Sequence, residues 1–206
     1  MMKLYHSTRS PYVRKAMIAI HEAGLAHEVL LETMRVSPSR DNPALFAVNP
    51  LGKLPTLVLD DGTAIFDSTV IVHYLDVVRG DGHLHPDDPD ARFQAMRDHA
   101  IGEGLMGLVV DWYSEKFRDP AADTNERFRL YDLRVRLTLD ELETQASRLA
   151  DTRFNIAHIA IACALGYLDF RFDDLDWRAG RPALAELGDH LNARPSVAAT
   201  KPYDDI

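Results

Sequence analysis

The sequence predicts a small α/β domain of order βαβαββα over residues 1–80, a linker at 81–89 and an all-helical domain over 90–206. Two observations support this division. Short strand-like runs separated by Gly, Pro and Asp turns occur only before the linker, whereas apolar residues after it recur at helical spacing. The stretch 80–89 is rich in Gly, Asp, His and Pro and has no periodicity, which is typical of a linker.

Composition limits the classes of protein that the chain can represent. It has 206 residues, 46% of them hydrophobic, and a formal net charge of -9. This acidity argues against unaided binding to nucleic acid or to an anionic membrane. A single cysteine, Cys163, excludes an internal disulfide. The apolar run 156–168 is too short to span a bilayer, and without a signal pattern we expect a cytoplasmic protein.

The first strand and helix are predicted at 3–6 and 11–24. Apolar residues mark one helical face at Val13, Ala16, Met17 and Ile20. Ser10 suits the N-cap, Pro11 the first turn and Gly24 the position just after the helix.

The remaining elements follow in order along the chain. In the α/β domain we expect a strand at 27–31, a loop at 33–43 with a short helix at 43–48, a strand at 56–59, a hairpin turn at 60–63, a return strand at 64–66 and a helix from Asp67 to about 79. In the helical domain we expect helices at 90–118, 123–149, 154–170 and 182–193, with a break at Asp119–Pro120.

The start of the first helix is the first candidate for chemistry. Ser10 would place one hydroxyl beside unpaired backbone N–H groups at the positive end of a helix dipole, which favours an anion. The alternative is that Ser10 only caps the helix.

Three motifs together resemble the glutathione S-transferase family: Ser10–Lys15 (SPYVRK), Asn49–Pro55 (NPLGKLP) and Phe66–Ser68 (FDS). The likeness covers essentially the whole chain and is strongest to bacterial serine-type members. The apolar helix containing Ile159–Leu168 is similar to that of the small YibF-like branch. The resemblance implies a thioredoxin-like domain joined to a helical bundle, and a homodimer.

The resemblance also implies a binding site for glutathione as co-substrate. Pro55 would be cis, so that the backbone N–H and C=O of Leu54 pair with the cysteine of glutathione. Asp67 and Ser68 would hold the γ-glutamyl group, and Lys53 the glycyl carboxylate. Read from the residues alone, Asp67 and Ser68 form an N-cap pair, Lys53 is a solvated loop lysine and Pro55 an ordinary loop proline.

Ser10 is the candidate catalytic residue, as a hydrogen-bond donor to the glutathione sulfur. Such a donor stabilises the thiolate. Ser7 and Thr8 are rival hydroxyls, and Tyr5 is a weaker candidate. A cysteine at position 10 would indicate thiol-transferase chemistry through a mixed disulfide, and serine argues against it.

The electrophile is expected between the two domains. Its candidate contacts are Tyr12, Leu105, Met106, Trp112 and Tyr113, and for each of them plain core packing is the favoured alternative. Arg9 and Arg14 would favour an anionic electrophile unless they are simply surface charges.

One position departs from the family pattern. The central helix of the helical domain usually begins with Ser/Thr-x-x-Asp, a capping box. Here Asn155 and His158 occupy those positions. A neutral imidazole nitrogen could replace the carboxylate as acceptor. No second ligand lies three or four residues away, so we expect no metal site at His158.

These observations favour a glutathione transferase acting on a small hydrophobic electrophile or a peroxide. Two alternatives stay open: a non-catalytic binding or stress-response protein of the same fold, and a glutathione-dependent isomerase or dehalogenase. The sequence does not identify the electrophile.

Overall fold

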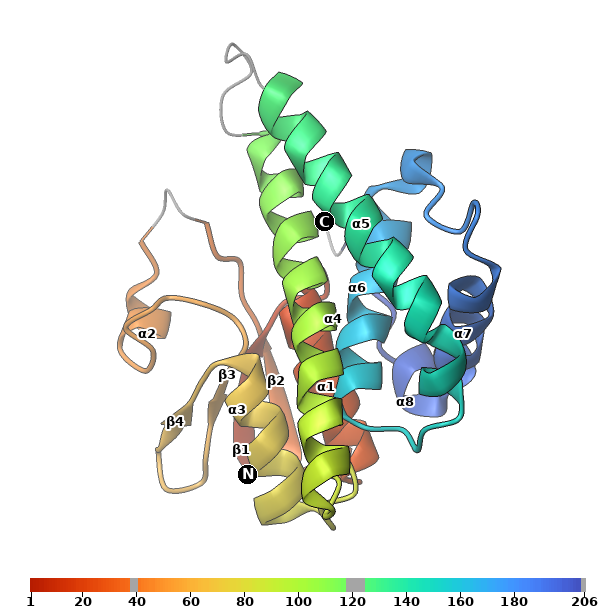
Figure 1. The fold of residues 1–206 in the computed structure, drawn as a ribbon. Helices are drawn as coiled ribbons and strands as arrows, with labels where there is room; N and C mark the ends of the chain where they lie inside the picture. Colours follow the sequence, from red (N-terminus) through yellow and green to blue (C-terminus); the bar gives the residue numbers. More distant parts are fainter. Residues whose placement is uncertain (38–40, 118–124, 205–206) are drawn as a thin grey trace. The chain divides into compact units, whose positions relative to one another are not determined.

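We analysed a computed structural model, which describes residues 1–37, 41–117 and 125–204. The chain forms two compact units, drawn in Figure 1. The N-terminal unit contains Met1–Pro86 and the segment from Ala199, and the helical unit contains Asp87–Ala198. Within the described ranges no helix is both long and apolar enough to cross a membrane.

A four-stranded sheet forms one layer of the N-terminal unit. Its strands are β1 (Met2–His6), β2 (Val29–Thr33), β3 (Thr56–Val58) and β4 (Ala64–Ile65). The order across the sheet is β2-β1-β3-β4. β1 pairs in parallel with β2, with Leu4 opposite Leu31, whereas β3 runs antiparallel to both β1 and β4. This mixed sheet confirms the predicted fold class.

Helices connect the strands of this unit as predicted. They are α1 (Pro11–Glu22), α2 (Pro43–Phe46), α3 (Ser68–His73) and the π-helical continuation η2 (Tyr74–Arg79). Gly24 adopts a φ of 69° after α1, in the left-handed region that glycine tolerates. The strand predicted at 27–31 begins only at Val29, because Ala26–Glu28 form a 3₁₀ turn, η1.

The helical unit confirms the four predicted helices and adds two short ones. It contains α4 (Pro89–Glu115), α5 (Asn125–Ala150), α6 (Ile156–Arg171), the 3₁₀ turn η3 (Asp173–Leu175), α7 (Pro182–Ala193) and α8 (Pro195–Ala198). The tail expected to be irregular after 193 thus begins with α8. The predicted break at Asp119–Pro120 lies outside the described residues.

α6 is the central helix of this unit, and every side chain from Ile156 to Leu168 is buried. It packs closely against α4 at Gly102. A Cβ atom added to Gly102 would lie 2.8 Å from the backbone nitrogen of Ile161 and 2.9 Å from the carbonyl carbon of Ala160. The absence of a side chain at Gly102 therefore allows the two helices to approach this closely.

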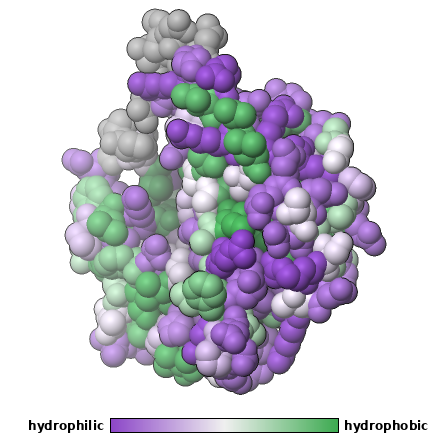
Figure 2. Space-filling model, viewed as in Figure 1, coloured by the Kyte–Doolittle hydropathy of each residue, from purple (hydrophilic) through white to green (hydrophobic). Residues whose placement is uncertain are grey.

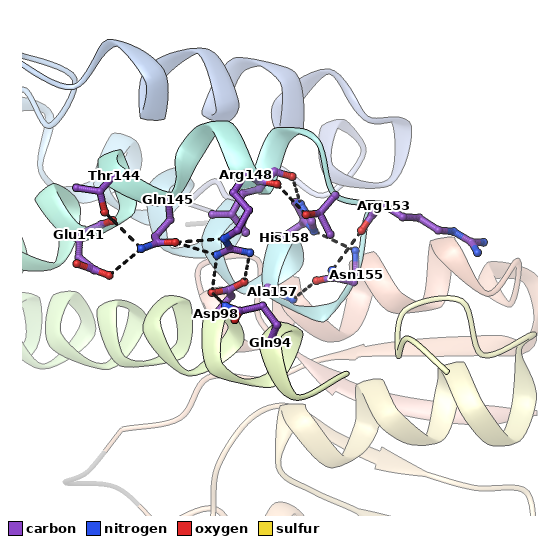
Figure 3. Close-up of polar contacts among 12 residues, drawn as sticks. Gln94, Asp98, Glu141, Thr144, Gln145, Arg148, Arg153, Asn155, Ala157 and His158 are labelled. Atoms are coloured by element: carbon purple, nitrogen blue, oxygen red, sulfur yellow. Dashed lines mark hydrogen bonds and ion pairs between the residues drawn. The ribbon is translucent and has the colours of Figure 1, made fainter. Parts of the chain in front are cut away.

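α6 begins with a capping box built on histidine (Figure 3). The Asn155 side chain accepts from Ala157 N–H at 2.9 Å, and His158 Nδ1 accepts from Asn155 N–H at 3.1 Å. Nε2 of the same ring lies 2.9 Å from the carbonyl oxygen of Leu149, to which it can donate. Burial lowers the pKa of His158, which favours the neutral ring that this arrangement requires.

The chain end departs from the predicted domain boundaries. The segment from Ala199, expected in the helical domain, is grouped with the N-terminal unit. Thr8 Oγ1 donates to the Tyr203 carbonyl oxygen at 2.8 Å, and Tyr203 N–H donates to the Thr8 carbonyl oxygen at 3.4 Å. This segment is therefore attached to the loop that precedes α1, a long-range pairing that local sequence signals do not reveal.

Candidate functional site

Ser10 caps α1 as the sequence predicts. Its backbone is extended, Pro11 follows in the first helical turn, and its Oγ accepts from Val13 N–H at 3.3 Å. Among the residues that the structure describes, the Ser10 hydroxyl has no acceptor for its own hydrogen. The capped helix start can therefore offer an O–H donor to an external acceptor.

The rival hydroxyls of the preceding loop differ from Ser10. Thr8 donates its hydroxyl hydrogen to Tyr203, so this hydrogen is already used. Ser7 Oγ accepts from Arg9 N–H at 3.4 Å but stands outside the helix start. Tyr5 is 8% exposed and belongs to an apolar cluster of the core. Of these four residues, only Ser10 has both a hydroxyl hydrogen without an acceptor among the described residues and a position at the N-terminus of α1.

A second part of the site is the loop before β3, where the Leu54–Pro55 peptide bond is cis, as expected. Asn49 is completely buried and organises this loop. Its side-chain NH₂ donates to the Lys53 carbonyl oxygen at 3.1 Å and to Thr56 Oγ1 at 2.9 Å, while its side-chain oxygen accepts from Leu51 N–H. Thr56 donates to the same Lys53 carbonyl oxygen. The loop is thus fixed by side-chain hydrogen bonds rather than by a sheet.

Leu54 lies in this loop outside the strand ladder. Within the described ranges its backbone N–H and C=O have no protein partner. Such a pair of groups can bind an extended peptide backbone, as a strand edge does. The neighbouring Lys53 is exposed and can reach solvent ions.

The third part of the site is the start of α3. Asp67 is its N-cap, and one carboxylate oxygen accepts from Thr69 N–H at 2.9 Å and from Val70 N–H at 3.4 Å. The residue is exposed, so its second oxygen is accessible to solvent. Ser68 is 1% exposed, and neither its hydroxyl nor its backbone N–H is bonded to any described residue. Asp67 therefore supplies the cap, and Ser68 leaves two polar groups for another partner.

Two contacts join these three parts. Val13, one turn after Ser10, shares a buried apolar cluster with Leu54. Lys15 on the same helix is 1% exposed, and its ammonium donates to Thr69 Oγ1 at 2.9 Å. α1 is thus fixed both to the loop before β3 and to the start of α3.

Sequence reasoning missed the residues that hold the site together, namely Asn49, Lys15 and Thr69. Asn49 stands in the Asn49–Pro55 motif that the sequence analysis used, but nothing in that motif singled it out as a buried amide. For Lys15 no local signal exists, because a lysine on an amphipathic helix normally lies on the solvated face.

The predicted electrophile contacts separate into two groups. Leu105 and Met106 are completely buried and belong to the core of the helical unit. Trp112 is 8% exposed and Tyr113 is partly exposed, and both lie in an aromatic group of that unit. Tyr12 is partly exposed in the N-terminal unit. Of the predicted cations, Arg14 is buried and thus not a surface charge.

The chain is similar to known proteins over nearly its whole length. Residues 9–78 match the glutathione S-transferase N-terminal domain, and residues 128–187 match the C-terminal domain. The uncharacterized GST-like protein YibF of Escherichia coli strain K12 is 33% identical, with 98% of each chain aligned.

Solved structures give the same result. A glutathione transferase family member from Pseudomonas fluorescens Pf-5 with bound glutathione is 39% identical, has a TM-score of 0.94 and aligns over 99% of this chain and all of that one. A second structure of a family member from that organism, with bound S-(propanoic acid)-glutathione, is 38% identical, has a TM-score of 0.88 and aligns over 98% and 100% of the two chains.

Proposed function

Because the chain belongs to the glutathione S-transferase family, we propose that it is a glutathione transferase that activates the glutathione thiol for attack on a small electrophile or a peroxide. The observation that carries this proposal is the Ser10 hydroxyl. Its oxygen accepts the capping hydrogen bond of α1. Its hydrogen has no acceptor among the described residues and can be donated to a ligand.

The chemistry follows from the acidity of the thiol. A free thiol has a pKa of about 8.5, so most glutathione is protonated at neutral pH. Ser10 donates a hydrogen bond to the sulfur, and the N-terminus of α1 contributes a favourable dipole. Both stabilise the thiolate relative to the thiol, which lowers its pKa and raises the fraction of the reactive form. Ser10 acts as a donor and forms no covalent bond.

The rest of the tripeptide is held by the other two parts of the site. The N–H and C=O of Leu54 pair with the cysteinyl residue, and the Ser68 hydroxyl and N–H bind the γ-glutamyl carboxylate. Asp67 accepts from the γ-glutamyl ammonium with the carboxylate oxygen that its cap leaves exposed, and Lys53 pairs with the glycyl carboxylate. The Pseudomonas fluorescens relatives hold glutathione and S-(propanoic acid)-glutathione, which supports a glutathione site in this chain.

We also propose that the chain forms a homodimer. Figure 2 shows hydrophobic residues gathered on the visible face of the N-terminal unit. Val70 and Val78 of α3 and η2 are 50% and 61% exposed, and Phe93 and Met96 on one side of α4 are 70% and 56% exposed. Exposed apolar residues in such number favour a protein interface.

The test is a titration of the bound thiol. The ultraviolet absorbance of the thiolate is followed against pH for glutathione bound to the wild type, to Ser10→Ala and to Ser7→Ala. We expect Ser10→Ala to raise the pKa of the bound thiol with little change in affinity, and Ser7→Ala to leave the curve unchanged. An unchanged curve for Ser10→Ala would remove Ser10 from the mechanism. Turnover of an electrophile then separates an enzyme from a binding protein that only retains glutathione.

A further inference from the structure

The helical unit contains a tryptophan whose hydrogen-bond donor is buried without an acceptor. Trp112 on α4 is 8% exposed, and its indole Nε1–H is bonded to no described residue. A buried polar hydrogen without an acceptor costs about 1–3 kcal/mol, and such groups are rare in folded proteins. This donor therefore indicates an acceptor other than the residues that the structure describes.

Two cations flank the aromatic residues around this donor. The Phe172 ring lies 4.8 Å from the Trp112 ring between centroids, and Tyr131 lies nearly parallel to Trp112 at 6.3 Å. Lys116 Nζ is 4.4 Å from the Phe172 centroid and 5.9 Å from that of Trp112. Arg171 Cζ lies 4.8 Å from the centroid of Tyr113, whose ring also contacts Phe172.

The second tryptophan of the chain, Trp177, also has a cation over its ring, but its indole N–H has a carboxylate acceptor. Trp177 Nε1–H donates to Asp169 Oδ1 at 2.7 Å. The Arg178 guanidinium lies over the Trp177 ring at 4.1 Å and binds both oxygens of the same carboxylate, at 2.6 and 2.9 Å. One carboxylate thus serves both an indole donor and the cation that covers the ring.

At Trp112 the indole donor and the cation are present, but no carboxylate from the described residues bonds to the indole. Lys116 forms no ion pair with any residue in the described part of the chain. The buried carboxylate of Glu115 is already paired with Arg127. A carboxylate from a ligand would therefore satisfy the indole hydrogen and neutralise the ammonium together.

We propose that Trp112, Tyr113, Tyr131, Phe172, Lys116 and Arg171 form a binding site for a small planar carboxylate, whose oxygen accepts from the Trp112 indole. The aromatic side chains bind the conjugated body, and Lys116 and Arg171 balance its charge. The ligand class of this site is therefore an unsaturated or aromatic carboxylic acid.

The test follows the two indole N–H resonances in an ¹⁵N-labelled full-length protein without glutathione. The resonances are assigned with Trp112→Phe and Trp177→Phe, and the probes are cinnamate and its uncharged analogue cinnamyl alcohol. We expect cinnamate to shift the Trp112 resonance saturably and to leave the Trp177 resonance in place. Cinnamyl alcohol should bind at least about tenfold more weakly, because it lacks the charge-assisted hydrogen bond.

Charge variants test the same site by a second route. Lys116→Gln should weaken cinnamate binding about tenfold, and Lys116→Arg should restore most of it. Arg178→Gln is the matched control, since it removes the cation over the tryptophan whose donor is already satisfied, and it should leave binding unchanged. An unmoved Trp112 resonance, equal binding of acid and alcohol, or no effect of Lys116→Gln would overturn the proposal. Because no glutathione is present, these outcomes are independent of the Ser10 titration.

Discussion

The imidazole of His158 accepts a hydrogen bond from the backbone N–H of Asn155, with 3.1 Å between Nδ1 and that nitrogen. A capping box normally uses a carboxylate or an amide at this place. Here the acceptor is a base that loses its accepting nitrogen when it is protonated, so the start of the central helix α6 is linked to pH.

The first prediction concerns stability against pH. Burial holds the pKa of His158 below its ordinary value of 6.5, so the unfolded chain takes up a proton before the folded chain does. The contribution of His158 is fully present above pH 6.5 and is lost as the pH falls from there toward the folded pKa. In that pH range, protonation of His158 should lower the unfolding free energy of the wild type by up to about 1.4 kcal/mol for each unit that the pH falls.

Urea unfolding between pH 5 and 8 measures this slope. His158→Gln keeps an acceptor for the cap without a titrating group and should give a flatter profile. His190→Gln, at an exposed histidine of the same unit, is the control and should keep the wild-type slope. Equal slopes for His158→Gln and the wild type would contradict the assignment.

The second prediction concerns the contact between α4 and α6. Gly102→Ala places a Cβ 2.8 Å from the Ile161 backbone nitrogen. This distance is too short for a van der Waals contact, so the backbones of α4 and α6 would have to move apart. We expect a loss of at least about 1–3 kcal/mol of unfolding free energy. Gly104→Ala on the same helix meets nothing within 4 Å and should stabilise by up to about 1 kcal/mol through helix propensity. Thermal unfolding measures both variants: the melting temperature should fall for Gly102→Ala and rise for Gly104→Ala. An unchanged melting temperature for Gly102→Ala would contradict the prediction.

The third prediction separates capping from binding at the start of α3. Ser68→Ala should weaken glutathione binding while the unfolding free energy stays near that of the wild type, because Asp67 provides the cap. Asp67→Ala should lower both affinity and stability, the latter by about 1 kcal/mol. Calorimetric titration with glutathione and urea unfolding measure the two effects. A Ser68→Ala protein with unaltered affinity would exclude Ser68 from the site.

The fourth prediction concerns the buried Lys15. Thr69→Val removes the hydroxyl that accepts from its ammonium at 2.9 Å. Since hydrogen bonds to charged groups contribute about 1.5–3 kcal/mol, we expect a loss of that order. Thr69→Ser keeps the hydroxyl and should lie close to the wild type. If Thr69→Val has the same unfolding free energy as the wild type in urea, the hydrogen bond from Lys15 would not contribute to stability.

Most of the fold could be predicted because its signals are local. Ser10 and Pro11 start α1, Gly24 follows it, and alternating or helical apolar spacing identifies most other elements within a few residues. The start of β2 was misplaced because the 3₁₀ turn over Ala26–Glu28 has no strong sequence signature.

By itself, the sequence determined the order of the elements and the caps of α1, α3 and α6, while the glutathione-binding roles of Leu54, Asp67 and Ser68 came from a family resemblance and stay predictions. The elements and their caps depend on side chains and on backbone groups only a few residues away, so short motifs encode them. Tertiary structure alone decided that Lys15 lies buried against Thr69 and that Tyr203 is bonded to Thr8. It also decided that Trp177 has a carboxylate partner, whereas Trp112 has none among the residues that the structure describes. Each of these depends on which distant residue packing brings within about 3 Å, and a local pattern does not contain that information.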